Sequence, residues 1–487
     1  MPAAPLLIAL FVAFAADSIV PPVRAEDLAS CLTETALALG LAASVAMGLG
    51  LGLTAAVRRR GYPTASSRRG LAWASYLVQA MNLVVFAWLI HGLGWPDFVR
   101  NGMGLKGVFV VDEVTILAPF LVAEVLGWCG LYPAARASRM IGAGSGPGSY
   151  LLRKARMAFG MILPAVVLFW AGADLAKRAL GDSAATPVVQ LGVMAAMGAV
   201  LLVISPAFVR LTWPARPLPA GPLRDRLERL AARFGFRFTD ILLWDTEGSV
   251  FNAVVTGALP WFRYVLLSDA LVDALDEHEV AAVFGHEMGH VRHRHLASFG
   301  LFFLGSLGVM ALAGQLVDLA STAVGAGVGT GYPAVELAKS VTVLAMVGVY
   351  YWIAFGLLSR RFERQADVFG CRAISCGRDD CEQCHYEGPR NVAAPDSVPL
   401  CAVGIRICVN ALETVAAENG IEPDSRSWRH GSIARRVSFL RGLQGHPEAE
   451  RRFQSGVLAL RLMFALLLAG ACVLAFASGA FESLRGG

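Results

Sequence analysis

The sequence carries little charge for its length. Asp, Glu, Lys and Arg make up 16% of the 487 residues, whereas hydrophobic residues make up 56%, and the mean hydropathy is +0.56. This composition excludes an ordinary soluble protein of this size. The sequence also lacks a glycine-rich loop that could cradle phosphates and an aromatic–basic recognition motif, so it indicates no nucleic-acid partner.

The composition instead favours a protein embedded in a lipid bilayer. Windows of about 20 apolar residues can cross a hydrocarbon core of about 30 Å. Such windows lie at residues 32–56, 71–94, 108–130, 157–176, 187–210, 297–320, 338–358 and 456–478. Several could be long buried helices, but together they favour a polytopic membrane protein.

The first 25 residues are typical of a signal peptide or an N-terminal anchor. An apolar stretch precedes Val23-Arg24-Ala25, which is a small-residue cleavage pattern. No Lys or Arg precedes Arg24, so the basic region of a signal peptide is missing and an uncleaved anchor stays open. In either case residue 26 is expected outside.

The distribution of basic residues predicts the topology. The loop at 57–70 has five arginines, and the loop at 131–156 has four arginines and a lysine, so both are expected in the cytoplasm. The alternate loops have fewer basic residues. The polar segments at 211–296 and 359–455 are therefore predicted on the cytoplasmic side of the cell (inner) membrane, and the net charge of +5 reflects this orientation and contact with anionic lipid.

The first polar segment has a mixed pattern of elements. Four prolines between residues 214 and 222 interrupt any helix, and an amphipathic helix is predicted to follow over 223–236. Short apolar runs at 236–245, 251–257 and 263–272 predict a small β-sheet. Acidic residues then begin, and basic residues end, the predicted helix at 275–295, which is the charge order that a helix dipole favours.

Residues 284–295 read FGHEMGHVRHRH. On a helix, His286 and His290 share one face and can present two imidazoles to one ion, with Glu287 beside them. This arrangement suits a zinc hydrolase, in which the metal lowers the pKa of its bound water to about 7 and a carboxylate takes the proton. The alternative is a histidine-rich helix end without a metal.

Such a site needs a third protein ligand, often a carboxylate from another helix. The segment SRRFERQAD, residues 359–367, places Glu363 and Asp367 on one face of a helix that is predicted to continue the apolar stretch before it. Glu363 could complete the site, and Asp367 could accept a hydrogen bond from a ligand imidazole and so fix its tautomer. The segment alone could be a solvated charged helix, but HEMGH on the same side of the membrane favours the metal site.

With these motifs, the sequence resembles the membrane-embedded zinc metallopeptidases that include the type 1 CAAX prenyl protease and the bacterial HtpX heat-shock protease. The resemblance covers roughly residues 220–440 and includes FNAVVTG and YVLLSDAL upstream and RHGSIARRVSFL downstream. The chain departs from the relatives at Gly431, where they usually carry Pro. The resemblance implies zinc ligands at His286, His290 and Glu363, a general base at Glu287 and an orienting carboxylate at Asp367.

The resemblance also implies roles for three residues outside the two motifs. The strand of Asn252 would pair with an extended substrate peptide. His430 would stabilise the negative charge that develops on the carbonyl oxygen, and Arg436 would hold a neighbouring carboxylate or the substrate backbone. Taken alone, Asn252 is an ordinary turn or strand-edge residue, His430 a helix cap and Arg436 a surface cation.

Residues 371–408 contain six of the nine cysteines and have no counterpart in the common relatives. A reducing cytoplasmic face argues against disulfides there. One interpretation is a second, structural zinc ion bound by Cys376, Cys381, Cys384 and His385. The other is a set of free thiols in a surface insert.

Other ionisable residues are expected to have lesser roles. His293 and His295 are predicted as exposed residues at the helix end, where they favour its dipole. Asp112, Glu113 and Glu124 fall within an apparent span and could line a wet chamber. If that span begins after Glu113, only Glu124 needs an explanation.

The fold class predicted from all this is a mainly α polytopic membrane protein with a small α+β, zincin-like cytoplasmic metalloprotease domain. The predicted function is a zinc metalloendopeptidase that acts on membrane-associated or cytoplasm-exposed polypeptides. The rival is a polytopic transporter or scaffold with a non-catalytic zinc site. Two His and one Glu leave a coordination position open for water, which favours the enzyme.

The predicted domain organisation interleaves spans and catalytic segments. Residues 1–25 are the signal peptide or anchor; 26–213 hold about five spans; 214–296 and 359–455 are the two parts of the catalytic domain; 297–358 hold two spans; and 456–487 hold a C-terminal span.

Overall fold

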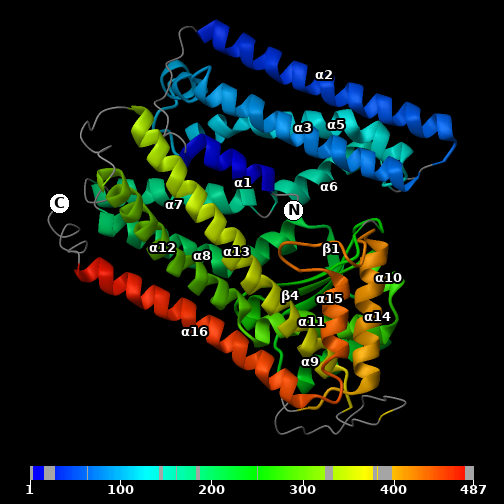
Figure 1. Ribbon diagram of the computed structural model, residues 1–487. Helices are drawn as coiled ribbons and strands as arrows, with labels where there is room; N and C mark the ends of the chain where they lie inside the picture. Colours follow the sequence, from blue (N-terminus) through cyan, green and yellow to red (C-terminus); the bar gives the residue numbers. More distant parts are fainter. Residues whose placement is uncertain are drawn as a thin grey trace. The chain divides into compact units, whose positions relative to one another are not determined.

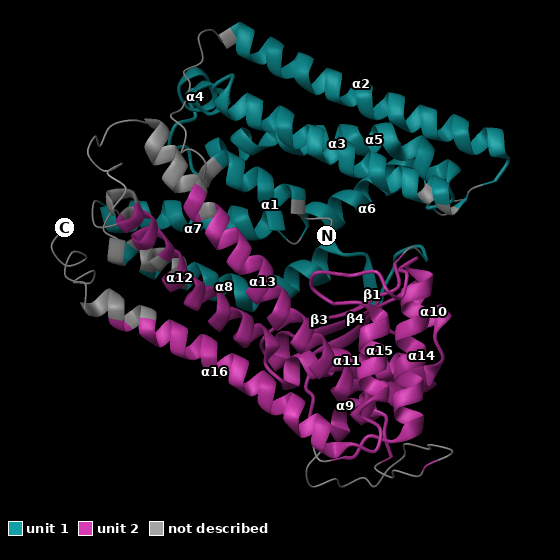
Figure 2. Cartoon of the chain, viewed as in Figure 1, with its two compact units in different colours: residues 1–216, 244–249 teal, residues 217–243, 250–487 magenta. Residues whose placement is uncertain are grey.

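The computed structural model describes residues 4–15, 28–62, 64–141, 146–160, 162–181, 187–248, 250–323, 333–376, 381 and 398–477. The predicted cleavage pattern at residues 23–25 lies outside these ranges. The chain divides into two compact units (Figure 2). One comprises residues 1–216 and 244–249, and the other comprises residues 217–243 and 250–487.

The first unit consists mainly of helices (Figure 1). They are α1 (Ala4–Leu10), η1 (Phe11–Ala15), α2 (Leu28–Arg60), α3 (Ala65–His91), α4 (Trp95–Asp97), η3 (Phe98–Gly102), α5 (Val111–Ala137), α6 (Pro147–Phe159), α7 (Ile162–Leu180) and α8 (Pro187–Thr212). The short strand β1 (Ala215–Pro217) follows at the boundary of the units.

Glycines allow α2 and α5 to pack closely. A Cβ atom at Gly50 would lie 2.0 Å from the carbonyl oxygen of Gly130, and a Cβ atom at Gly130 would lie 2.7 Å from the backbone of Ala46. A larger residue cannot fit at either position. Close contacts through small residues are the usual way in which membrane helices associate.

The acidic residues of α5 occupy two kinds of position. Asp112 and Glu113 lie in the first turn of the helix, whereas Glu124 lies well inside it. Glu124 is buried and accepts a hydrogen bond from the side-chain amide of Asn82 at 2.9 Å. A polar partner on a neighbouring helix therefore accounts for the acidic group inside this apolar helix.

The second unit combines a small sheet with further helices. Its remaining strands are β2 (Asp240–Trp244), β3 (Ala253–Thr256) and β4 (Tyr264–Ser268). Its helices are α9 (Pro222–Arg233), η5 (Pro260–Phe262), α10 (Asp269–Ala274), α11 (Glu277–Arg292), α12 (His295–Ala323), α13 (Pro333–Ala373), α14 (Ala402–Glu418), α15 (Ile433–Arg441) and α16 (Pro447–Ala477).

The strands form one sheet in the order β1-β2-β4-β3. β3 pairs antiparallel with β4, so that residues 253–256 lie opposite residues 267–264. β3 is the last strand in this order, and the described residues place no strand along its other edge. One buried core contains Leu227 of the amphipathic helix α9, Val265 of β4 and Phe284 of α11, which confirms both the predicted sheet and the predicted helix.

The predicted helix at 275–295 is interrupted near its end. α11 ends at Arg292, and Arg294 has a φ angle of +52°, which a residue other than glycine rarely adopts. The chain therefore turns before α12 begins at His295. By contrast, α13 continues unbroken through residues 359–367, as predicted. A buried cluster joins α12, α13 and α16, and its members are Phe302, Leu358, Phe362, Val457 and Phe464.

The described helices support the predicted membrane embedding. Five of them, α2, α3, α5, α12 and α16, are long and apolar enough to cross a membrane. α6 and α7 meet at a bend of 51° and would add a sixth span if they form one broken span. The other predicted windows, 187–210 and 338–358, lie in α8 and α13. The prediction of a mainly helical, polytopic membrane protein is confirmed.

Candidate active site

α11 carries the HEMGH residues and packs closely against α13. It begins with a capping box, in which Asp276 accepts a hydrogen bond from the Glu279 N–H at 2.9 Å and the Glu279 side chain accepts one from the Asp276 N–H at 3.2 Å. A Cβ atom at Gly289 would lie 3.0 Å from the backbone of α13, and one at Gly370 of α13 would lie 3.0 Å from the nitrogen of His286. These glycines set the short distance between the two helices.

The two helices bring three predicted ligands together. One ligand atom from each of His286, His290 and Glu363 lies within 4.8 Å of the others. The Nε2 atoms of the histidines are 3.1 Å apart, and each lies 3.9 Å from a carboxylate oxygen of Glu363. Ligand atoms around a tetrahedral zinc ion are about 3.3 Å apart, given bonds of about 2.0–2.1 Å. Both the type and the spacing of these donors therefore fit a zinc ion.

Asp367 and Arg436 lie behind His286. Asp367 accepts a hydrogen bond from His286 Nδ1 at 2.9 Å, which leaves Nε2 to face the other ligands. Although burial opposes a charged imidazole, Asp367 outweighs it and raises the pKa of His286. The guanidinium of Arg436 donates two hydrogen bonds to Asp367, at 2.8 and 2.5 Å, and lies 3.5 Å from Glu363. A bidentate ion pair of this kind holds a carboxylate in one orientation.

His295 is buried behind His290, so the prediction of an exposed residue was wrong. Its side chain has 2% relative exposure and stacks on Phe362, with the ring centroids 4.2 Å apart. Its Nδ1 lies 2.9 Å from Nδ1 of His290, and its Nε2 lies 3.0 Å from Oε1 of Gln365. The amide oxygen can only accept, so His295 donates to Gln365 and accepts from His290, which leaves His290 Nε2 free to bind a metal.

No pattern in the sequence indicates this role of His295. On a continuous helix, a residue five positions after His290 would not share its face. The turn at Arg294 moves His295 onto the next helix, and arginine is not a residue type that predicts a positive φ. His293, predicted as exposed too, is half-buried and stacks against His295 with the ring centroids 5.9 Å apart.

The protonation of two of the three ligands, His290 and Glu363, suits a metal ion. Burial and the neighbouring His286 lower the pKa of His290 to about 4, which keeps its imidazole neutral. Burial opposes ionisation of Glu363, but His430 and Arg436 outweigh it and hold the pKa of that carboxyl far below its usual range. The site therefore offers a neutral imidazole and a carboxylate.

Glu287 points toward the edge strand of the sheet. Its Oε2 accepts a hydrogen bond from the N–H of Val255 in β3 at 3.2 Å. Burial raises the pKa of Glu287 to about 7. A carboxyl group with such a pKa can both take and release a proton near neutral pH.

His430 lies beside Glu363, with its Nδ1 3.1 Å from a carboxylate oxygen. Its side chain is 49% exposed. Ser432, not His430, caps α15, because its side chain accepts a hydrogen bond from the N–H of Arg435. The helix-cap alternative for His430 is therefore excluded, and its role in charge stabilisation stays a prediction.

The turn before α15 explains why the chain has glycine at position 431. Gly431 has a φ angle of +76°, which proline cannot adopt. Its N–H also donates a hydrogen bond to the carbonyl of Ser427 at 2.9 Å, and proline has no N–H to donate. The departure from the relatives thus belongs to a local turn that keeps His430 next to Glu363.

Asn252 immediately precedes β3. Its N–H donates to the side chain of Ser268 at 3.0 Å, and its carbonyl accepts from the N–H of Ser268 at 3.0 Å. These bonds fix the start of the edge strand on β4. The structure thus places Asn252 at the strand edge, and its contact with substrate stays a prediction.

The cysteine cluster in the structure differs from the residues predicted for a second metal site. Cys384 and His385 lie outside the described residues. Cys376 and Cys381 are described, and the third member of their cluster is Cys401, which the predicted ligand set did not contain. Cys401 lies at the far end of the cysteine-rich insert, and nothing in its spacing indicated this contact.

Comparison with known proteins agrees with the site. The sequence profile of peptidase family M48 matches residues 217–455, which contain every residue of the site described above. This segment belongs to peptidase family M48. The resemblance predicted from the motifs is thereby confirmed.

Curated relatives of the M48 segment come from both branches of the predicted resemblance. A CAAX prenyl protease 1 homolog of Arabidopsis thaliana is 28% identical over 175 residues, which are 35% of this chain and 40% of the relative. A Protease HtpX homolog of Bordetella pertussis is 30% identical over 150 residues, 30% of this chain and 49% of the relative. The matches thus span less than half the length of either relative.

A solved structure also aligns with this chain. The crystal structure of Ste24p from S. mikatae has a TM-score of 0.48 and 17% sequence identity, and the match covers 84% of this chain and 98% of that one.

Proposed function

We propose that this chain is a membrane-embedded zinc endopeptidase that hydrolyses peptide bonds of membrane-associated or cytoplasm-exposed polypeptides. The observation that carries the proposal is the convergence of His286, His290 and Glu363, with the carboxylate of Glu287 adjacent. Membership of the segment in a peptidase family supports it.

The three ligands would hold the zinc ion and leave one tetrahedral position open, as in catalytic zinc sites. When bound, zinc lowers the pKa of a water molecule to about 7 and polarises a carbonyl group. Asp367 and His295 orient the two imidazoles through their Nδ1 atoms. The chain's own groups therefore fix both the ligands and their tautomers before substrate arrives.

Glu287 acts as the general base in this proposal. It takes a proton from the attacking water and then delivers it to the leaving amine. The hydrogen bond from the Val255 N–H fixes its carboxylate in the apo site. A divalent cation close by favours the carboxylate form of Glu287, which is the form that accepts the proton.

The edge of β3 offers a binding place for the substrate. The N–H of Val255 points away from β4, toward Glu287, so a peptide that extends the sheet along this edge would pass the general base. Asn252 begins the same strand. His430 and Arg436 lie near Glu363, where they can stabilise the developing negative charge and hold the neighbouring carboxylates.

The rival function is a transporter or scaffold with a non-catalytic zinc site. Structural zinc sites are usually closed by four Cys or His ligands, whereas this cluster has three ligands among the described residues. A scaffold also has no need for a buried general base. Both features favour the peptidase.

The test is Glu287→Gln in the purified full-length chain. The variant keeps all three ligands and loses the proton acceptor, so zinc content should equal that of the wild type while proteolysis falls by about 10²-fold or more. Turnover close to that of the wild type would refute the mechanism.

His286→Ala and Glu363→Ala form the matched comparison. Each removes a ligand and should lose the catalytic zinc together with activity. A variant that retains its full zinc content would remove the substituted residue from the ligand set.

A further inference from the structure

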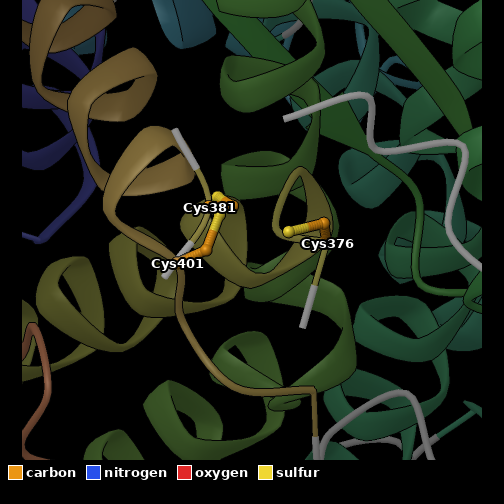
Figure 3. A group of neighbouring side chains, drawn as sticks. All are labelled: Cys376, Cys381 and Cys401. Carbon is orange, nitrogen blue, oxygen red and sulfur yellow. The ribbon is translucent and has the colours of Figure 1, made fainter. Parts of the chain in front are cut away.

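The cysteines around the insert fall into two groups. Cys371 and Cys408 hydrogen-bond to each other in the core, and burial raises the pKa of Cys371 well above its usual value. Such thiols act as small apolar side chains. Cys376, Cys381 and Cys401 instead lie close together (Figure 3), with their sulfur atoms within 4.8 Å of one another. None of these three cysteines is part of a disulfide.

The backbone around these three thiols is well anchored. Cys376 follows the end of α13, and Cys401 caps the start of α14. The N–H of Cys401 donates to Oγ of Ser375 at 3.1 Å, and the guanidinium of Arg372 donates to the carbonyl of Val398 at 3.0 Å. The end of one helix and the start of the next are therefore held together independently of any ion.

The backbone donors favour a thiolate at Cys401. The N–H of Gly404 donates to its sulfur at 3.2 Å, and a Cβ atom at Gly404 would lie 2.5 Å from Oγ of Ser375. Burial opposes the thiolate, but the N–H groups of Cys376 and Gly404 outweigh it and lower the pKa of Cys401 to about 7. Burial and the neighbouring thiols raise the pKa of Cys381 to about 11.

We propose that Cys376, Cys381 and Cys401 bind a zinc ion at a site that shares no ligand with the candidate active site. Sulfur atoms around a tetrahedral zinc ion are about 3.8 Å apart, given Zn–S bonds of about 2.3 Å, and the three sulfur atoms here lie within 4.8 Å of one another. Thiolates are soft ligands that select zinc over the hard cations calcium and magnesium.

The ion would act as a clamp. It joins the C-terminal end of α13 to the N-terminal end of α14 and to Cys381 in the insert between them. α13 also carries Glu363 and Asp367, so the clamp stabilises the helix that completes the active site. The inference does not depend on the proposed peptidase activity.

The experiment measures zinc per chain in the purified full-length protein. The double variant His286→Ala/His290→Ala removes the catalytic ligands and should retain one zinc ion. Adding Cys401→Ser to this background should reduce the zinc content to nearly none. Cys408→Ser, a nearby buried cysteine outside the cluster, is the matched control and should retain one ion.

Cobalt substitution gives a second, spectroscopic readout. The wild type should show a sulfur-to-cobalt charge-transfer band in the near ultraviolet, which His286→Ala/His290→Ala should keep. Cys381→Ser should lose it, and because Cys381 lies outside any helix, this variant should fold normally.

Two outcomes would overturn the proposal. One is a His286→Ala/His290→Ala variant without zinc and without the charge-transfer band. The other is a disulfide between two of these three cysteines in the native chain, found by non-reducing peptide mapping as a cross-linked pair of peptides. If His286, His290 and Glu363 do not bind zinc but the cysteine cluster does, the wild type should contain one zinc ion, and Cys401→Ser should remove it. Failure of the proposed function and failure of the cysteine site are therefore distinguishable.

Discussion

His295→Phe tests whether His295, which lies behind His290, strengthens zinc binding by orienting the imidazole of His290. Phenylalanine retains the ring shape and can keep the stack on Phe362, but it removes both hydrogen-bonding nitrogens. Gln365 keeps a donor to the same amide oxygen, because Arg461 Nη2 lies 3.1 Å from it. The substitution therefore isolates the hydrogen bond to His290.

The expected magnitude follows from the environment of His290. A buried N–H that loses its acceptor costs about 1–3 kcal/mol. The side chain of His290 is 27% exposed, so water can replace part of this bond and the lower half of the range applies. A loss of about 1–2 kcal/mol corresponds to a five- to thirtyfold weaker affinity for zinc, at about 1.4 kcal/mol per factor of ten.

The assay is a titration of peptidase activity against buffered free zinc, with an unfolded protein as substrate. His295→Phe should raise the zinc concentration for half-maximal activity by that factor while maximal activity stays within a few-fold of the wild type. His293→Phe is the control, because it replaces a neighbouring imidazole that stacks on His295 and leaves the hydrogen bonds of His295 to His290 and Gln365 in place. A midpoint within twofold of the wild type would refute the orienting role.

Three further predictions concern the surrounding groups and the topology. Arg436→Met removes the bidentate partner of Asp367, whose side chain is 2% exposed. It should lower the free energy of unfolding by about 3–5 kcal/mol. A decrease below 1 kcal/mol in detergent-solubilised protein would contradict the ion-pair argument. His430→Ala should lower kcat by roughly 10²-fold with zinc content and thermal stability near those of the wild type, and unchanged kinetics would remove this residue from the reaction. A reporter fused near residue 445 should report cytoplasmic and one after residue 480 external, because of the asymmetry of basic residues; an external signal at 445 would invert the topology.

The parts of the site that were predictable are those that depend on helical periodicity. His286, His290, Glu363 and Asp367 come from two segments in which residues four apart share a helix face, and the structure brings these faces together. The glycine of HEMGH, Gly289, is explained only by the neighbouring helix, since a Cβ atom there would touch the backbone of α13.

The parts that could not be predicted depend on breaks and on long loops. The backbone turn at Arg294 brings His295 to His290, and no residue-type preference indicates it. Cys401 joins Cys376 across an insert whose path the spacing of cysteines does not define. Arg436 pairs with a carboxylate far away in sequence, and the family resemblance, rather than any local pattern, pointed to it.

The unbroken course of α13 sets the distance between Glu363 and the apolar part of the same helix. Glu363 follows the apolar window that ends at residue 358, and five residues of helix rise about 8 Å. On the other ligand helix, α11, His290 lies five residues before His295, where the apolar helix α12 begins. Under the proposed function, the catalytic centre therefore lies at a fixed distance from the bilayer surface. A polypeptide substrate would then be selected by the distance of its susceptible bond from the membrane as well as by its sequence.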